Sequence, residues 1–225
     1  MIRVFSSYAC DILTYENNRE IPGWPALWIE QTLDSLDASY VLQSGESAWK
    51  VRIDRIDGRD RGTILATYPI PFCDGGSDDI MLISTLANEF SLSSLTHTDR
   101  RVCIDVQWYL RGEAGKKYFD CSDIPCVWSV FLKATQEEFS YLRNTQYPNH
   151  TFLITNGGSD VEVRQEWCIL FSVPVRSGEF SDTIGAGDTF FSSFVYFYEN
   201  TGDIYEAIQK ANEYTYNFLS TKNSF

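Results

Sequence analysis

The most informative stretch of the sequence is Ser181-Asp182-Thr183-Ile184-Gly185-Ala186-Gly187-Asp188, which is followed by the apolar run 189–198. Gly185-Ala186-Gly187 is small enough to let a bulky anion touch the backbone. The run behind it is apolar on nearly every side, as expected of a helix buried in a core. A helix that begins near Ala186 would direct its free N–H groups and the positive end of its dipole at whatever rests on the glycines. The stretch therefore predicts an anion site, and phosphate is the usual occupant of such a site.

Asp188 lies in the first turn of this expected helix, close enough to reach a hydroxyl group brought up to the anion. The alternative is that Asp188 only caps the helix, since acidic residues favour first turns. Capping alone does not require Gly-Ala-Gly before the acid. We therefore favour a catalytic role for Asp188.

Residues 182–188 also resemble the D-T-x-G-A-G-D signature of the ribokinase (PfkB) carbohydrate kinases. Ile184 stands where many members have Thr, but the central Gly-Ala-Gly-Asp is intact. The resemblance implies an α/β fold of the ribokinase-like type, with a mainly parallel sheet, helices on both faces and a small or reduced β hairpin as a lid. It also implies ATP-dependent phosphorylation of a hydroxyl on a sugar or sugar-like molecule, with Mg²⁺ as cofactor. Asp188 would be the base, and the amides of Gly185, Ala186 and Gly187 would form the anion hole.

The size and charge of the chain limit the remaining possibilities. Its 225 residues fit a single domain, 1–225, and its formal net charge is -13. Such a surface repels nucleic acid and anionic membranes, so neither is an expected partner. The six cysteines include no C-x-x-C pair, which argues against a zinc site. The N-terminus lacks the apolar core of a signal peptide, and we expect a cytoplasmic protein.

The first strand and the residues after it are candidates for the acceptor site. Residues 2–6 form a short β-type run that leads to Asp11. The resemblance implies that Asp11 binds hydroxyl groups of the acceptor; an ordinary loop acid is the alternative. Pro25 suits the first position of a helix that reaches Leu36, and Gly23 before it matches a substrate-binding glycine of the family. Trp24 replaces a second glycine there and would either narrow the pocket or pack on the surface.

The region 46–70 has the pattern of a β hairpin. Apolar and polar residues alternate on both sides of Asp57-Gly58, a strong turn signal. Relatives carry a lid over the sugar in this region. Here there is room for little more than one hairpin, so we expect a more open acceptor site.

Two short apolar runs, 80–83 and 102–104, are typical of parallel strands buried on both faces. Asp105 stands where the second run ends, and Arg111 follows. Open α/β sheets bind ligands outside the carboxyl ends of their strands. Asp105 and Arg111 are therefore secondary site candidates, with a surface salt bridge as the alternative for Arg111.

Thr135 and Glu138 open a helix after the apolar run 129–133, with the spacing of a capping box. The resemblance offers Glu138 a second role, because the family has an N-x-x-E motif here whose Glu places Mg²⁺ through water. Thr135 replaces the Asn of that motif. Both roles for Glu138 remain open.

The resemblance also implies nucleotide contacts and a further cation. The strand that ends at Thr155 and the glycine turn at Gly157 would lie beside the nucleotide, and Asn212 in the last helix would lie near the adenine. Asp182 lies near a monovalent-cation loop in several relatives, which makes K⁺ an optional cofactor. Ile184 departs from the family pattern at that loop.

Two other functions fit the same residues. The acceptor could be a nucleoside or a hydroxymethylpyrimidine, since one fold serves varied acceptors. A non-catalytic relative that binds a nucleotide or metabolite is the second alternative. It is favoured by the altered Trp24, Thr135 and Ile184 and opposed by the intact Asp188. The expected partners are ATP and a sugar-like small molecule, and a homodimer remains open.

Overall fold

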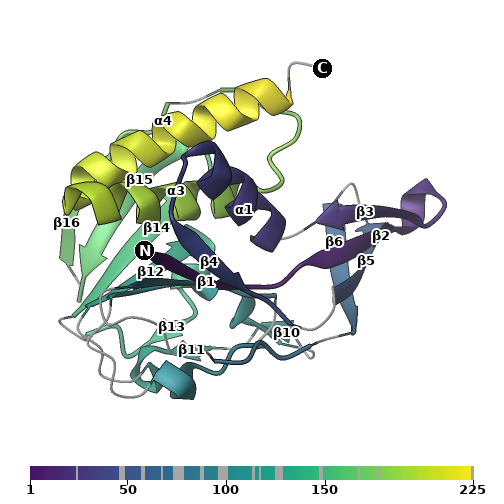
Figure 1. Cartoon of the computed structure of the whole chain (residues 1–225), viewed down its shortest axis with the longest axis horizontal. Helices are drawn as coiled ribbons and strands as arrows, with labels where there is room; N and C mark the ends of the chain where they lie inside the picture. The colour runs from purple at the N-terminus through teal and green to yellow at the C-terminus, as the bar shows by residue number, and fades with distance from the viewer. Residues whose placement is uncertain are drawn as a thin grey trace.

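The computed structural model has a large and a small β-sheet, with its long helices packed on the large one (Figure 1). The structure describes residues 1–23, 25–45, 49–56, 59–66, 68–72, 79–86, 89–95, 101–112, 115–116, 118–124, 129–146, 149–166, 168–176 and 178–223. Trp24, Asp57-Gly58 and the loop around Gly75 lie outside the described residues.

The large sheet has eight strands in the order β16-β15-β14-β12-β8-β7-β1-β4. Six adjacent strands, from β14 to β4 in this order, pair in parallel, and β15 pairs antiparallel with both β14 and the edge strand β16. The central strands are buried on both faces, as their unbroken apolar runs predicted. The strands are β1 (Ile2–Ser6), β4 (Tyr40–Gln43), β7 (Ile80–Ser84), β8 (Arg101–Asp105), β12 (Ser129–Thr135), β14 (His150–Asn156), β15 (Ser159–Gln165) and β16 (Cys168–Val173).

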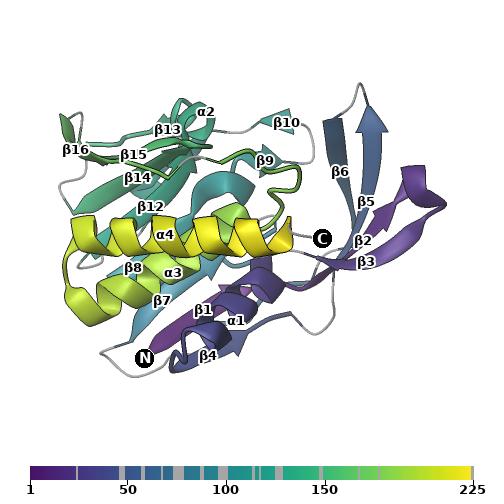
Figure 2. The same ribbon diagram turned by 90° about the horizontal axis from the view of Figure 1, so that it is seen from above.

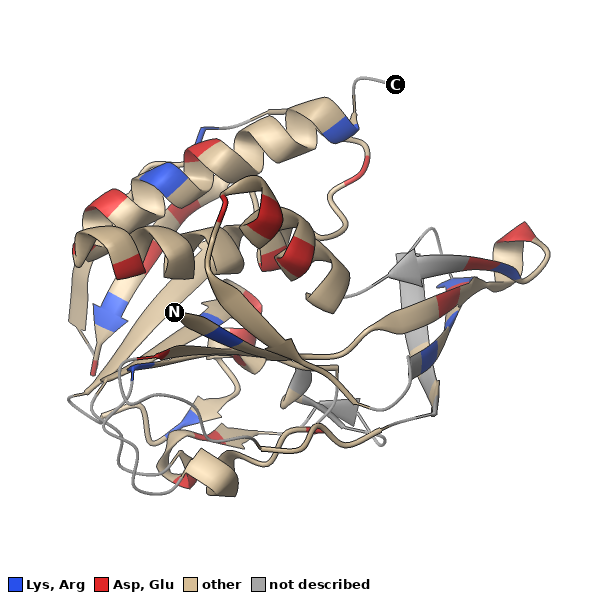
Figure 3. Ribbon diagram, viewed as in Figure 1, with Lys and Arg blue, Asp and Glu red and all other residues tan. Residues whose placement is uncertain are grey.

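The three long helices cover one face of this sheet. They are α1 (Pro25–Ser35), α3 (Ala186–Thr201) and α4 (Ile204–Lys222), and α4 runs alongside α3 (Figure 2). Their apolar side chains, among them Ile29, Phe194 and Ala211, share one core with the strands. Acidic residues occur on the outer surfaces of all three helices (Figure 3). Among the described helices, none is long and apolar enough to span a membrane.

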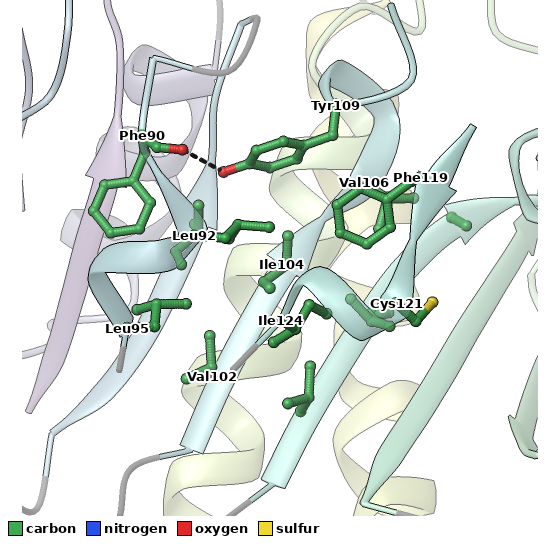
Figure 4. Packing of buried hydrophobic residues seen from close by; sticks show 14 of the residues in the cluster. Phe90, Leu92, Leu95, Val102, Ile104, Val106, Tyr109, Phe119, Cys121 and Ile124 are labelled. Carbon is green, nitrogen blue, oxygen red and sulfur yellow. Dashed lines mark hydrogen bonds between the residues drawn. The ribbon is translucent and has the colours of Figure 1, made fainter. Parts of the chain in front are cut away.

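The opposite face is covered by shorter pieces around a second core (Figure 4). There Tyr109 donates a hydrogen bond of 3.1 Å from its hydroxyl to the carbonyl of Phe90, which satisfies a polar group inside this core. The single-turn helix α2 packs on this side through Phe139. The pieces are the 3₁₀ turns η2 (Leu92–Leu95), η3 (Val106–Trp108) and η4 (Cys121–Asp123), helix α2 (Gln136–Phe139), and the strand pairs β9 (Arg111–Gly112) with β10 (Gly115–Lys116) and β11 (Phe119–Asp120) with β13 (Leu142–Arg143). The mainly parallel α/β fold is confirmed.

The small sheet is larger than the expected hairpin. Its strands β5 (Trp49–Ile56) and β6 (Arg59–Ala66) pair antiparallel, as the alternating pattern predicted. Strands β2 (Ala9–Leu13) and β3 (Arg19–Gly23), joined by the turn η1 (Thr14–Glu16), extend it to the order β3-β2-β5-β6. The hairpin predicted at 46–70 is confirmed, but the prediction did not include β2 and β3, which lie outside that region and enlarge the same sheet. Strand β2 pairs parallel with β5, a long-range pairing that turn signals between neighbouring strands do not reveal.

Candidate active site

Polar side chains gather where the parallel strands of the large sheet end. Ser6 of β1 lies in register with Ser84 of β7, and Asp105 of β8 lies in register with Lys133 of β12. All four residues are buried, whereas the residues just before them are apolar. Ligands of open α/β sheets bind at this edge, outside the carboxyl ends of the strands. The candidate site is therefore built on the buried central strands of the large sheet.

The glycine turn lies at the start of α3. Gly185 has φ +84°, a left-handed conformation that favours glycine. A Cβ at Gly185 would lie 2.5 Å from the indole of Trp28 on α1, so the close packing of α1 against the turn also requires glycine. The Ala186 N–H donates to the carbonyl of Thr183 at 3.1 Å. Of the three residues predicted for an anion hole, Ala186 has thus already used its amide within the loop.

Asp188 lies in the first turn of α3 and is half-buried. Its carboxylate accepts a hydrogen bond from the hydroxyl of Ser84, with 3.2 Å between Oγ and Oδ1. Ser84 is itself fixed in the last position of β7. The bond holds one oxygen of Asp188 toward the strand ends. The sequence analysis did not identify Ser84, because its partner is 104 residues away in the chain.

Lys133 is the main functional candidate that the sequence analysis missed. Its Nζ donates to Oδ2 of Asp105 at 2.6 Å, and the two side chains are only 3% and 1% exposed. A Cβ at Gly187 would lie 3.0 Å from this Nζ, so the ammonium group lies directly beside the glycine turn. Burial alone would lower the pKa of Lys133, but the nearby carboxylates of Asp105 and Asp188 raise it above its ordinary value. Lys133 therefore stays positively charged at the predicted anion site.

The sequence did contain a signal for Lys133. Lysine is almost never fully buried unless it is paired, and Lys133 falls inside the apolar strand 129–135. A lysine in such a strand calls for a buried acid on the neighbouring strand. Asp105, already a candidate, is that acid.

The capping box at the start of α2 is confirmed. Thr135 Oγ1 accepts from the Glu138 N–H at 3.2 Å, and Glu138 Oε2 accepts from the Thr135 N–H at 2.8 Å. Within the described ranges, no three His, Cys, Asp or Glu side chains group closely enough to hold a metal ion. Mg²⁺ commonly binds through one or two carboxylates plus substrate phosphates and water, and the carboxylate of Glu138 is of the kind that such an ion uses.

The predicted nucleotide residues lie on three different elements. Thr155 near the end of β14 donates to the carbonyl of Ala134 at 3.4 Å, and Gly157 has φ +56° in the turn that follows. Asn212 lies on the buried side of α4, and its Nδ2 has no hydrogen-bond partner among the described residues. A buried amide without a partner is costly, which makes Asn212 a reasonable ligand-binding candidate.

A pocket of about 380 Å³ lies beside β14 and β15. Gln136 and Asn156 line it together with Asp160 and Glu162. The two acidic side chains repel phosphate, so this pocket does not suit the anion. The glycine turn and the strand-end residues remain the candidate phosphate site.

The three residues predicted to bind the acceptor are described in different detail. Asp11 lies in β2 of the small sheet, not in a loop, and is 8% exposed. Burial raises the pKa of its carboxyl group from 3.8 to about 7. Gly23 ends β3, where its backbone pairs with Ala9 beside α1. Arg111 lies in β9, paired with Lys116, and its side chain is outside what the structure describes.

Comparison with known proteins agrees with this architecture. Residues 128–215 match the family model described as "pfkB family carbohydrate kinase". No curated protein matches the chain. A fructokinase from Vibrio cholerae is 15% identical with a TM-score of 0.67, and 99% of each chain is covered.

Two further solved structures show the same fold. A nucleoside kinase from Methanocaldococcus jannaschii is 15% identical with a TM-score of 0.65, covering 99% of this chain and 93% of that one. A pyrophosphate-dependent kinase in the ribokinase family, solved with a pyrophosphate analog and myo-inositol, is 14% identical with a TM-score of 0.64, covering 98% and 95%. The shared fold and the family match over the segment that contains the glycine turn together confirm the resemblance of this chain to the ribokinase-like PfkB family.

Proposed function

We propose that this protein is a kinase that transfers the terminal phosphoryl group of ATP to a hydroxyl of a sugar or sugar-like molecule. The observation that carries the proposal is the position of Asp188. It lies one residue beyond the glycine turn, in the first turn of α3, with the buried Lys133 ammonium beside the same turn. A carboxylate next to a glycine turn and a buried ammonium group supports this proposal, because transfer to a hydroxyl needs a base close to the phosphate.

Asp188 would accept or align the proton of the attacking hydroxyl. Proton transfer by a positioned side chain typically contributes about 10²–10⁴-fold to the rate. The hydrogen bond from Ser84 fixes the carboxylate of Asp188 toward the strand ends, beside the glycine turn. This arrangement favours catalysis over the alternative of a non-catalytic binding protein.

The glycine turn would hold the transferred phosphoryl group. Phosphoryl transfer depends mostly on positioning and on neutralising charge, because the protein does little covalent chemistry. The first N–H groups of a helix have no partner within the helix, and together with the positive end of the α3 dipole they favour an anion at Gly185 and Gly187. The fixed charge of Lys133 adds to them from the strand side. When bound, Mg²⁺ would neutralise further phosphate charge, and Glu138 would hold its water ligands.

The remaining candidates would bind the two substrates. Thr155, Gly157 and Asn212 would contact the nucleotide. Asp11, with Gly23 and Arg111, would contact the acceptor. A nucleoside or hydroxymethylpyrimidine stays an alternative acceptor, and pyrophosphate is a second donor to test, because one of the similar structures is a pyrophosphate-dependent kinase.

The test compares substitutions of two aspartates, each at the start of a helix. Asp188→Asn should lower the phosphorylation rate by about 10²–10⁴-fold, with nucleotide affinity little changed. Asp203→Asn is the matched control, because Asp203 caps α4 by accepting from the Glu206 N–H at 3.0 Å and Asn caps equally well.

Both variants and the wild type are assayed with ATP and with pyrophosphate against a panel of sugars, nucleosides and vitamin precursors. The substrates are first ranked by thermal shift. If Asp188→Asn keeps more than half of the wild-type turnover on the best acceptor, the assigned role of Asp188 is wrong.

A further inference from the structure

The loop in front of the glycine turn is attached to the carboxyl end of α4. The Asp182 N–H donates to Asn223 Oδ1 at 2.9 Å, and Asn223 Nδ2 donates back to the Asp182 carbonyl at 3.0 Å. Ser181 Oγ donates to the same Asn223 oxygen at 2.8 Å. The last turn of α4 and this loop therefore form one hydrogen-bonded unit.

Lys222, the last residue of α4, places its ammonium group inside this unit. Its Nζ lies 2.9 Å from Asp182 Oδ2 and donates to the Ile184 carbonyl at 2.8 Å. The same Nζ lies 4.7 Å from the centre of the Trp28 ring, whose indole packs against Gly185. A positive charge is also favoured at this end of a helix by the helix dipole. The ammonium group thus contacts the loop on both sides of Thr183.

The surroundings of this ammonium group are those of a cation site. A carboxylate oxygen and a carbonyl oxygen are the ligands that hard metal cations prefer. Here both oxygens already face the charge of Lys222 at hydrogen-bond distance. A second positive ion at the same oxygens would be repelled by the ammonium group. The optional K⁺ at Asp182, which the resemblance implied, does not fit these residues.

We infer that Lys222 is a built-in cation, which holds the loop 181–185 in the shape that the glycine turn needs and makes the protein independent of monovalent metal ions. This inference rests on the proposed function only for its activity readout. Lys222 is a positioning residue, because it contacts Asp182 and Ile184 and not the reacting groups. Its effect reaches the anion site through Gly185, which follows Ile184 directly.

The first test needs no variant. The melting temperature and the phosphorylation rate of the wild type are measured in KCl, NaCl and tetramethylammonium chloride at equal ionic strength. Both quantities should be the same in all three salts. Specific activation or stabilisation by K⁺ would overturn the inference.

The second test removes the charge in two ways. Lys222→Ala removes the side chain and leaves room for a cation, whereas Lys222→Met fills the same space with an uncharged side chain. Both should lower kcat by about 10-fold, as expected when about 1.4 kcal/mol of positioning is lost. K⁺ or NH₄⁺ should restore the rate and raise the melting temperature of Lys222→Ala but not of Lys222→Met. Lys210→Ala, which removes the exposed Lys210–Glu206 pair (2.8 Å) on the same helix, should change neither quantity.

The outcomes separate this inference from the proposed function. If no acceptor is phosphorylated by any form, the proposed function fails, but a K⁺-dependent rise in melting temperature seen only in Lys222→Ala still supports the built-in cation. If Lys222→Ala keeps the full phosphorylation rate, and K⁺ changes neither its rate nor its melting temperature, the inference is wrong even if the proposed function is right. If neither variant folds, the comparison of the wild type in the three salts still tests whether the protein is independent of K⁺.

Discussion

Two buried acids, one in each sheet, differ in their electrostatic surroundings. Asp105 in the large sheet is 1% exposed and pairs with the ammonium group of Lys133 at 2.6 Å. Asp11 in the small sheet is 8% exposed, and burial raises the pKa of its carboxyl group to about 7. The large sheet therefore holds an acid paired with the positive charge of Lys133, whereas the small sheet holds a carboxyl group whose charge changes near neutral pH.

This difference suits the two tasks proposed for the two regions. A phosphate group is anionic at every working pH, so a permanent positive charge such as that of Lys133 is useful beside it. An acceptor hydroxyl is neutral, and a carboxyl group can hydrogen-bond to it in either protonation state. We expect substitutions at the large sheet to affect stability and donor binding, and substitutions at Asp11 to affect acceptor choice and pH dependence.

The largest effect is expected from Lys133→Met. This change leaves the Asp105 carboxylate buried without its ion pair, which costs about 3–5 kcal/mol of unfolding free energy. Because about 1 kcal/mol shifts the melting temperature of a protein of this size by about 2–4 °C, the loss should be roughly 10 °C. Thermal and denaturant unfolding measure it. The KM for the phosphoryl donor should rise as well.

The double variant Lys133→Met/Asp105→Asn separates the two roles of Lys133. Removing both charges should recover much of the lost stability, because no uncompensated charge remains. The donor KM should stay high if Lys133 binds phosphate. Recovery of both quantities would reduce Lys133 to a structural partner of Asp105 and would weaken the contrast between the two sheets.

Asp11→Ala should act on the acceptor instead. The expected loss in kcat/KM is roughly 2–4 kcal/mol, the cost of leaving a hydrogen-bonding partner unpaired. The loss should be much smaller for a deoxy analogue that lacks the hydroxyl concerned. Wild type and variant are assayed on the best acceptor and its deoxy series. Equal losses across the series would show that Asp11 does not recognise hydroxyl groups.

The pH dependence of stability tests the same residue without a substrate. Because the pKa of Asp11 is raised from 3.8 to about 7 in the folded state, the folded protein binds more protons than the unfolded chain between these values. Its contribution to stability is therefore present at low pH, is lost as the pH rises through this window, and is constant above it. The stability of Asp11→Asn relative to the wild type should increase by roughly 3 kcal/mol between pH 4.5 and pH 8.

Denaturant unfolding at the two pH values measures this difference. Asp54→Asn is the control, since Asp54 lies in the same small sheet but is only half-buried. Parallel pH profiles for wild type and Asp11→Asn would contradict the raised pKa. They would also remove the proposed contrast between Asp11 and Asp105.

The fold and the glycine turn were predictable because their signals are local. The apolar runs at 80–83 and 102–104 are continuous, and the Gly185–Asp188 segment is directly followed by the helix that it starts. The four-stranded small sheet was not predicted. Strands β2 and β3 are short, and the pairing of β2 with β5 joins segments about 40 residues apart, for which periodicity carries no signal.

The sequence analysis also missed the charged pairs, although a lysine inside the apolar strand 129–135 was a signal for one of them. Lys133 and Asp105 are 28 residues apart, and Lys222 and Ile184 are 38 residues apart. Their contacts follow from strand order and from the packing of α4, which side-chain type alone does not specify. Asp188, in contrast, was predicted from its own neighbours, and its role stays a prediction until the variant is measured.

The smallest effect is expected from Glu138→Gln, again at the large sheet. As a member of the capping box, Gln reaches the Thr135 N–H as well as Glu does, so the melting temperature should hardly change. Thr135→Ala, which removes the reciprocal bond, should cost about 1 kcal/mol and calibrates the capping contribution. If Glu138 also holds the waters of Mg²⁺, Glu138→Gln should raise the Mg²⁺ concentration needed for half-maximal activity, while Thr135→Ala should not. An unchanged Mg²⁺ dependence would leave Glu138 only its structural role, and the charged groups proposed at the phosphate site would then be the Lys133–Asp105 pair of the large sheet and Asp188 of α3.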